Sequence, residues 1–337
     1  MKNFNNLIKK ALQLHEEGKI QYAINLYSKA LESQKKDSQL LFLLGTAYIQ
    51  LGKTEKGIEQ LNKSISLKPK NAFAYSNLGN AFKDLKRYNE ALTSYDKAIQ
   101  INPNFADIHN NRGSILKNLK RYEEALASYD KAIRIKSDHA FAHNNKGNTL
   151  KDLKRYDEAI ASYDKSIKIN PNFADTYNNK GNALKDLKRY DEALSNYEKV
   201  VKLKLDFDYI LGKVLHTKMI LCSWNNFDSL SKKISKALNK NSKVIEPFSF
   251  LGLIDNPGAS KLSSEIFVKD KISKPSKIKP LSKYKNHNKP RIGYYSADFC
   301  DHAVLHLMMD VFRNHNKSLF DFFGFSFGPD KNDNWRN

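Results

Sequence analysis

Cysteine is scarce in this 337-residue sequence: Cys222 and Cys300 are the only two, and they lie 78 positions apart. Two such residues cannot form a disulfide scaffold or a thiolate zinc site by themselves, and nothing near either one indicates an activated thiol. Long apolar runs are also missing, because no stretch approaches the roughly 18 residues that a membrane helix needs. Residues 1–20 lack the apolar core and the cleavage site of a secretion signal. The sequence therefore predicts a cytoplasmic protein with no metal site and no membrane partner.

Acidic residues are outnumbered, with 36 Asp and Glu against 57 Lys and Arg, which gives a formal net charge of +21. Such a charge is typical of nucleic-acid-binding proteins. Part of the excess is local, however, because residues 261–291 contain ten basic residues and only two acidic ones, Glu265 and Asp270. This stretch has the composition of a connector between domains. We therefore do not expect nucleic acid to be the partner.

A repeat of 34 residues organises more than half of the sequence. The hexapeptide KDLKRY begins at Lys83, Lys151 and Lys185, and KNLKRY begins at Lys117. Glycines recur with the same spacing at Gly45, Gly79, Gly113, Gly147 and Gly181. A large residue recurs at Tyr27, Leu61, Tyr95, Tyr129, Tyr163 and Tyr197. The resulting six repeats are 4–37, 38–71, 72–105, 106–139, 140–173 and 174–207. Their period and their alternation of small and large positions are those of the tetratricopeptide repeat, a pair of packed helices.

Each repeat has the hydrophobic spacing of two helices that pack closely. In the third repeat Tyr75, Gly79 and Phe82 follow a helical spacing of four and three. The small residues Gly79 and Ala91 allow the two helices to approach each other, and a large residue fills the space between neighbours. Residues 4–207 are therefore predicted to form an all-α tetratricopeptide superhelix, a right-handed α-solenoid of two helices per repeat.

A stripe of polar residues runs along the first helix of each repeat, on the face that packing does not use. At its sixth position, repeats three to six all carry asparagine: Asn77, Asn111, Asn145 and Asn179. Asparagine is a poor residue for a helix interior because its amide competes for backbone hydrogen bonds. One interpretation is a ladder of amides that pair with the backbone of an extended peptide. The alternative is recent duplication, in which copied repeats carry copied asparagines whether or not these are used.

The regular pattern stops after the sixth repeat. Leu215 stands where the glycine would recur, while apolar residues keep a helical spacing, so we expect closing helices over 208–243 that cover the open end of the solenoid. Residues 244–290 are rich in Lys and Pro and are expected to form an irregular connector. From 291 to 337, two β-prone runs flank a segment of helical spacing. This order is typical of the opening of a Rossmann-like α/β domain.

Three segments after the repeats carry a specific pattern. They are LCSWNNF at Leu221–Phe227, RIGYYSADFCDHAVLHLM at Arg291–Met308 and FDFFGFSFGPD at Phe320–Asp330. With the repeats before them, they resemble the tetratricopeptide-containing protein O-linked N-acetylglucosamine transferases of the bacterial type. The resemblance implies a glycosyltransferase with two Rossmann-like domains that moves N-acetylglucosamine (GlcNAc) from UDP-GlcNAc to protein Ser or Thr hydroxyls. It implies no metal and no cofactor other than the UDP-GlcNAc donor.

The resemblance also indicates candidate site residues. His302 matches the histidine of the family's first catalytic loop, near the reacting centre, and its pKa range suits a general base. The alternative is a polar residue in the first turn of a helix. His306 matches the second histidine of the motif and is expected to pack behind the site. The four asparagines match the family's asparagine ladder. Cys300 and Asp301 stand where the family commonly has Gly and Asn, and Ala303 replaces the usual Pro.

Only the front of the family's catalytic region is present, because the sequence ends at Asn337. We therefore expect this chain alone to bind no UDP-GlcNAc and to transfer no sugar, which leaves open whether it acts as an enzyme. Two functions remain. In the first, the chain is the recognition arm of a protein O-GlcNAc transferase-like enzyme and binds protein or peptide substrates in the repeat groove. Alternatively, it is a non-catalytic adaptor that mediates protein–protein interaction.

Overall fold

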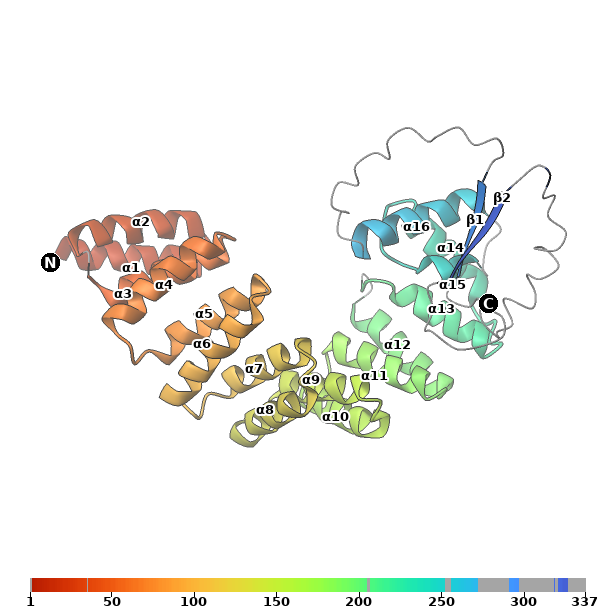
Figure 1. Cartoon of the computed structure of the whole chain (residues 1–337), viewed down its shortest axis with the longest axis horizontal. Helices are drawn as coiled ribbons and strands as arrows, with labels where there is room; N and C mark the ends of the chain where they lie inside the picture. The colour runs from red at the N-terminus through yellow and green to blue at the C-terminus, as the bar shows by residue number, and fades with distance from the viewer. Residues whose placement is uncertain are drawn as a thin grey trace. The chain divides into compact units, whose positions relative to one another are not determined.

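The computed structural model describes residues 2–34, 36–204, 207–251, 256–271, 291–296, 318 and 321–326. The chain divides into two compact units, residues 1–272 and residues 273–337. The helices described below belong to the first unit, and the two strands belong to the second (Figure 1).

Residues 2–203 form a stack of helix pairs, one pair per repeat (Figure 1). The first helices of the pairs are α1 (Lys2–Glu16), α3 (Ser38–Gln50), α5 (Ala72–Asp84), α7 (Ala106–Asn118), α9 (Ala140–Asp152) and α11 (Ala174–Asp186). The second helices are α2 (Ile20–Ser33), α4 (Thr54–Leu67), α6 (Tyr88–Ile101), α8 (Tyr122–Ile135), α10 (Tyr156–Ile169) and α12 (Tyr190–Leu203). Each second helix packs on the first helix of its own repeat and on the next helix along the chain. The predicted all-α solenoid is therefore confirmed.

The turn inside each repeat has one backbone conformation, which fixes how its two helices meet. In the third repeat the Lys86 N–H donates to the Lys83 carbonyl at 2.9 Å, and the Arg87 N–H donates to the Phe82 carbonyl at 2.8 Å. This pair of bonds is a Schellman arrangement, which requires a left-handed residue after the helix. Lys86 supplies it with a φ of 59°. The same left-handed conformation recurs at Gly18, Gly52, Lys120, Lys154 and Lys188.

Glycine is needed in the first helix because a tyrosine ring occupies the space where a side chain would lie. A Cβ atom added to Gly79 would lie 2.6 Å from Tyr95 Cε1, well inside van der Waals contact. The same clash would occur between Gly113 and Tyr129, Gly147 and Tyr163, and Gly181 and Tyr197. All four tyrosines are fully buried. The small and large positions of the sequence pattern are therefore packing partners, as predicted.

Four more helices follow in the first unit: α13 (Ile210–Ile220), α14 (Phe227–Leu238), α15 (Pro247–Leu251) and α16 (Pro257–Lys271). Helix α13 packs on α12, and α14 and α15 pack on α13. The sequence pattern placed the end of the last repeat at residue 207, but the backbone follows the 34-residue spacing for one more helix. Cys222, 34 residues after Lys188, is left-handed at the end of α13 with a φ of 51°. The side-chain pattern changes there because the buried Leu215 stands at the glycine position, and Gly212, three residues earlier, faces Ile245 from outside the repeats.

The expected irregular connector over 244–290 is helical in part, which corrects the sequence-based expectation. Helix α16 occupies Pro257–Lys271, and its Leu262 and Ile266 pack against the apolar core that runs from the last repeats into α13, α14 and α15. The high Lys and Pro content concealed these apolar residues. Residues 272–290 lie outside the described part of the chain.

The second unit contains two parallel strands, β1 (Arg291–Ser296) and β2 (Asp321–Ser326). Their register runs from Arg291 opposite Asp321 to Ser296 opposite Ser326. Parallel neighbours require a crossover connection, as the expected strand–helix–strand order provides. Most of that connection lies outside the described residues, so the Rossmann-like domain itself stays a prediction.

Candidate functional site

The first helices of successive repeats pack on one another: α3 with α5, α5 with α7, α7 with α9 and α9 with α11. Their polar stripes therefore form one continuous surface, which we call the ladder face. It is defined by the ladder asparagines (Asn77, Asn111, Asn145 and Asn179) and by the residues three positions later (Asn80, Ser114, Asn148 and Asn182). Residues three apart share one side of a helix, so each pair lies together on this face.

Every ladder asparagine is half-buried and is hydrogen-bonded to the preceding repeat. Asn145 Nδ2, for example, donates to Asn110 Oδ1 at 3.0 Å. The corresponding bonds join Asn77 to Thr46 Oγ1 (3.0 Å), Asn111 to Asn80 Oδ1 (3.2 Å) and Asn179 to Asn144 Oδ1 (3.1 Å). One N–H of each amide thus links two repeats, a role that neither sequence interpretation foresaw. An amide has two N–H groups and a carbonyl oxygen with two lone pairs, so capacity for a ligand remains.

The second row of the ladder face is tied to the buried tyrosines. Tyr95 Oη donates to Asn80 Oδ1 at 2.7 Å within the same repeat. The same bond joins Tyr163 to Asn148 (2.8 Å) and Tyr197 to Asn182 (3.0 Å). These asparagines therefore satisfy buried hydroxyl groups, which would otherwise be costly to bury. Their oxygens face the tyrosines, and their NH₂ groups consequently point elsewhere.

The fourth repeat breaks this rule, because Ser114 replaces the asparagine. Its side chain is shorter, and Ser114 Oγ donates to the Asn110 carbonyl at 3.2 Å. The Tyr129 hydroxyl is fully buried and makes no well-aligned hydrogen bond among the described residues, although the Ser114 and Thr149 hydroxyls lie close enough to interact with it. Burial raises the pKa of this hydroxyl, as it does for the other buried tyrosines.

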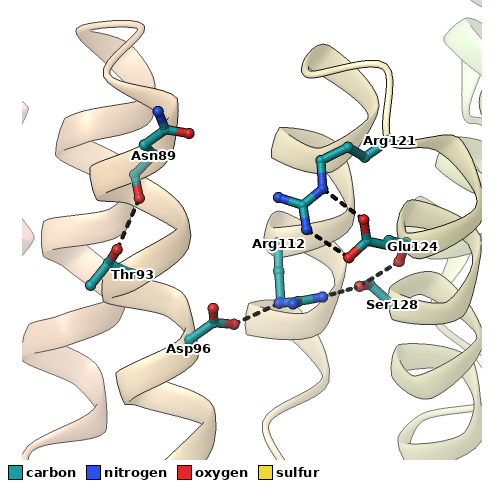
Figure 2. Close-up of polar contacts among 7 residues, drawn as sticks. All are labelled: Asn89, Thr93, Asp96, Arg112, Arg121, Glu124 and Ser128. Atoms are coloured by element: carbon teal, nitrogen blue, oxygen red, sulfur yellow. Dashed lines mark hydrogen bonds and ion pairs between the residues drawn. The ribbon is translucent and has the colours of Figure 1, made fainter.

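Ion pairs and charged hydrogen bonds also connect the repeats. Figure 2 shows Arg112 of α7 between two second helices. Its Nε donates to Asp96 Oδ1 of α6 at 2.7 Å, and its Nη1 donates to Ser128 Oγ of α8 at 2.8 Å. Lysines take the same place one and two repeats later, where Lys146 and Lys180 pair with Asp130 and Asp164. These contacts fix neighbouring repeats against each other.

A second series of pairs is incomplete at the junction of repeats three and four. Arg155 binds Glu158 of its own repeat and reaches Glu123 of the preceding repeat at 3.7 Å. Arg121 binds Glu124 in the same way, but Asn89 stands where the acid of the preceding repeat would be (Figure 2). Exposed pairs of this kind contribute about 0.2–1 kcal/mol, so their effect on the array is small.

Other residues considered in the sequence fall into two groups. His302 and His306, with Cys300, lie outside the described residues, so their proposed roles stay predictions. His109 and His143 of the repeats are buried, and the Nε2 atom of each forms a hydrogen bond with a backbone carbonyl, that of Pro103 at 2.9 Å and that of Ser137 at 3.2 Å. Burial lowers the pKa of both histidines. Neither therefore forms part of the ladder face.

Within the part of the chain that the structure describes, no cluster of His, Cys, Asp and Glu is arranged to hold a metal ion. None of the described helices is long and apolar enough to cross a membrane.

Comparison with protein families agrees with this geometry. One model of the tetratricopeptide repeat matches residues 45–86 and 79–120. A second model of this repeat matches residues 106–139, 140–173 and 174–207. The model of glycosyl transferase family 41 matches residues 264–337.

A curated relative and two solved structures extend the comparison. The chain is 25% identical over 139 residues to the probable UDP-N-acetylglucosamine–peptide N-acetylglucosaminyltransferase SEC of Arabidopsis thaliana, a match that covers 36% of this chain and 14% of that protein. The structure of pilF from Pseudomonas aeruginosa has a TM-score of 0.53 at 22% identity, covering 59% of this chain and 90% of its own. PilW, described as a type IV pilus biogenesis factor, has a TM-score of 0.54 at 20% identity, with 59% and 92% covered. These two likenesses concern the fold alone.

The helix pairs and the repeat matches make this chain a tetratricopeptide-repeat protein. The family 41 match after the repeats and the plant relative support the resemblance to the N-terminal region of the tetratricopeptide-repeat O-linked N-acetylglucosamine transferases that the sequence motifs indicated.

Proposed function

We propose that the ladder face binds extended polypeptide, and that the chain is the recognition arm of a protein O-GlcNAc transferase-like glycosyltransferase. One observation carries the proposal: on four successive repeats, a half-buried amide is held in a fixed orientation by a hydrogen bond to the preceding repeat. An extended peptide presents a carbonyl and an N–H at every residue. Amides that bind these groups contact the main chain, so they accept many sequences.

The fixed orientation favours binding because less rotational freedom is lost when a peptide arrives. Each net hydrogen bond contributes about 0.5–1.5 kcal/mol. Within the same proposal, the partners are protein or peptide substrates, the sugar donor is UDP-GlcNAc, and the location is the cytoplasm. His302 lies near the reacting centre, and His306 packs behind it.

The test is the affinity of the 337-residue chain for a fluorescein-labelled, uncharged 15-residue peptide of Ser, Thr, Ala and Gly, measured by fluorescence anisotropy. Replacing all four ladder asparagines by alanine removes at least four bonds. At the lower end of their range this is about 2 kcal/mol, or a roughly thirtyfold weaker affinity. Binding is compared at a temperature where circular dichroism shows both proteins fully folded.

A matched control separates binding from stability, because the ladder amides also link the repeats. Asp130→Ala with Asp164→Ala removes two inter-repeat ion pairs, those with Lys146 and Lys180, but keeps all four ladder amides and their hydrogen bonds. This variant should melt at a lower temperature and keep its affinity to within about threefold, roughly 0.6 kcal/mol. Unchanged peptide affinity in the quadruple variant would show that the asparagines are copied without being used for binding.

A further inference from the structure

The asparagine ladder ends in a lysine. Lys213 of α13 lies 34 residues after Asn179 and so occupies the next position of the ladder series. Its Nζ makes the same kind of contact with the preceding repeat as the ladder amides do, donating to Asn178 Oδ1 at 2.7 Å and to Asn182 Oδ1 at 3.0 Å. The α13 end of the ladder face therefore carries an ammonium group where the other repeats carry an amide.

The surroundings of Lys213 are neutral or basic. Its Nζ lies 5.6 Å from the centre of the Tyr197 ring, an arrangement that favours a cation. Among the described residues, Glu246 is the carboxylate that acts on it most, and it does so through space, without a hydrogen bond. Burial, against the opposing effect of Glu246 and together with the charges of Lys185, Lys151 and Lys271, lowers the pKa of Lys213 to about 8. A half-buried ammonium whose hydrogen bonds, among the described residues, go to neutral amide oxygens is poorly compensated.

Two further groups beside Lys213 are suited to an anion. Asn182 Oδ1 accepts from both Tyr197 and Lys213, so its NH₂ group points away from them and can donate. Lys185 follows Asn182 by three residues on the same side of α11, and its side chain is exposed. An ammonium has three N–H groups, and Lys213 uses two of them on asparagine oxygens.

We infer that Lys213, together with Asn182 Nδ2 and Lys185, forms a binding site for a carboxylate at the α13 end of the ladder face. The inference rests on the proposed function, in that a peptide on the ladder face supplies the carboxylate. The group is either the side chain of Asp or Glu or the C-terminal carboxylate of the peptide. Charged hydrogen bonds are stronger than those between neutral groups, so this site selects acidic peptides where the rest of the ladder does not discriminate.

The experiment uses four fluorescein-labelled peptides with one shared body of Ser, Thr, Ala and Gly. They end in Gln-amide, Glu-amide, Gln with a free carboxylate, or Glu with a free carboxylate. A peptide with the preferred carboxylate should bind the 337-residue chain about tenfold more tightly than the Gln-amide peptide, which corresponds to one charged hydrogen bond. The Glu-amide and free-carboxylate peptides distinguish the two sources.

The decisive variant is Lys213→Asn, which places the ordinary ladder residue at this position and keeps a donor for Asn178 or Asn182. It should abolish the tenfold preference and leave the affinity for the Gln-amide peptide within twofold. The control is Lys188→Asn, which removes the same charge at an exposed left-handed turn that asparagine tolerates, and which should keep the preference. In the wild type the preference should also fade as the pH rises past about 8, while ordinary lysines remain charged.

The outcomes separate the two proposals. Equal binding of all four peptides with dependence on the ladder asparagines overturns the carboxylate site and supports the ladder. Binding of the acidic peptides alone, lost in Lys213→Asn, supports the carboxylate site and overturns the ladder. A preference that survives Lys213→Asn reflects the net charge of the protein and also overturns the carboxylate site. No binding of any peptide overturns both.

Discussion

Removing the hydroxyl of two equivalent tyrosines should have opposite effects on stability. Tyr163 and Tyr129 are both fully buried at the same position of adjacent repeats. Tyr163 Oη donates to Asn148 Oδ1 at 2.8 Å, whereas the Tyr129 hydroxyl makes only poorly aligned contacts with the Ser114 and Thr149 hydroxyls. Tyr163→Phe therefore loses a net hydrogen bond, about 1 kcal/mol, while Tyr129→Phe removes a poorly satisfied polar group and should be neutral or stabilising by up to about 1 kcal/mol.

Ser114→Asn completes the test, because it restores the acceptor that the other repeats have. It should stabilise the protein by about 1 kcal/mol, and Tyr129→Phe should then cost about as much as Tyr163→Phe does. For a cooperative array of about 200 residues, 1 kcal/mol corresponds to about 2–4 °C in melting temperature. Circular dichroism at 222 nm with heating and with urea measures both quantities. A Tyr129→Phe penalty equal to that of Tyr163→Phe in the Ser114 background would refute the reasoning.

Three further perturbations address the turn, the packing and the buried histidines. Lys120→Gly should stabilise the array by about 0.5–1 kcal/mol, because Lys120 has a φ of 60° that glycine adopts freely. The reverse change, Gly52→Lys, should lower the free energy of unfolding measured with urea by a similar amount. Gly113→Leu should cost about 3 kcal/mol or more, since even a Cβ there would lie 2.6 Å from a tyrosine ring carbon. In the Gly113→Leu variant, amide hydrogen exchange should accelerate over repeat four and stay slow in distant repeats. Uniform acceleration over all repeats would contradict a local effect. Burial lowers the pKa of His109 and His143 below the ordinary 6.5, so the unfolded chain takes up protons first as the pH falls and stability should drop below about pH 6.5. The urea midpoint should be lower at pH 5.5 than at pH 7.5, and this decrease should be smaller in the variant with His109→Gln and His143→Gln. An equal decrease of the midpoint in both proteins would argue against the histidines as the cause.

The architecture was accessible from the sequence because the period is repeated six times. The glycine at the position of Gly79 and the tyrosine at the position of Tyr95 both recur every 34 residues. A small position and a large position that recur with the same period indicate packed helices, even when no contact is known. The same argument failed beyond residue 207. Helix α13 keeps the backbone phase, as Cys222 shows, but Gly212 packs on Ile245 from outside the repeats. Its side-chain pattern therefore no longer resembles that of the array.

Helix α16 was missed for a related reason. Leu262 and Ile266 have a helical spacing, but lysines and prolines surround them, and composition alone favours a connector. The packing of these residues on the core of the closing helices outweighs local composition, because burial of an apolar face stabilises a helix more than propensity does.

The roles of the ladder asparagines could not be read from their recurrence, because a copied residue looks the same whether it binds a ligand, a neighbouring repeat or nothing. The structure separates these roles through partners. Asn148 accepts from a buried tyrosine, and Asn145 donates to the preceding repeat. The most informative positions are then those where one copy departs from the others. Ser114 leaves the buried Tyr129 hydroxyl without a well-aligned hydrogen bond, and Lys213 puts a charge where four repeats have an amide. A departure at a position whose structural role is known has a physical consequence that can be measured, whereas a further identical copy adds no constraint. For this reason single substitutions at Ser114 and Lys213 test the arrangement more sharply than changes at the repeated asparagines.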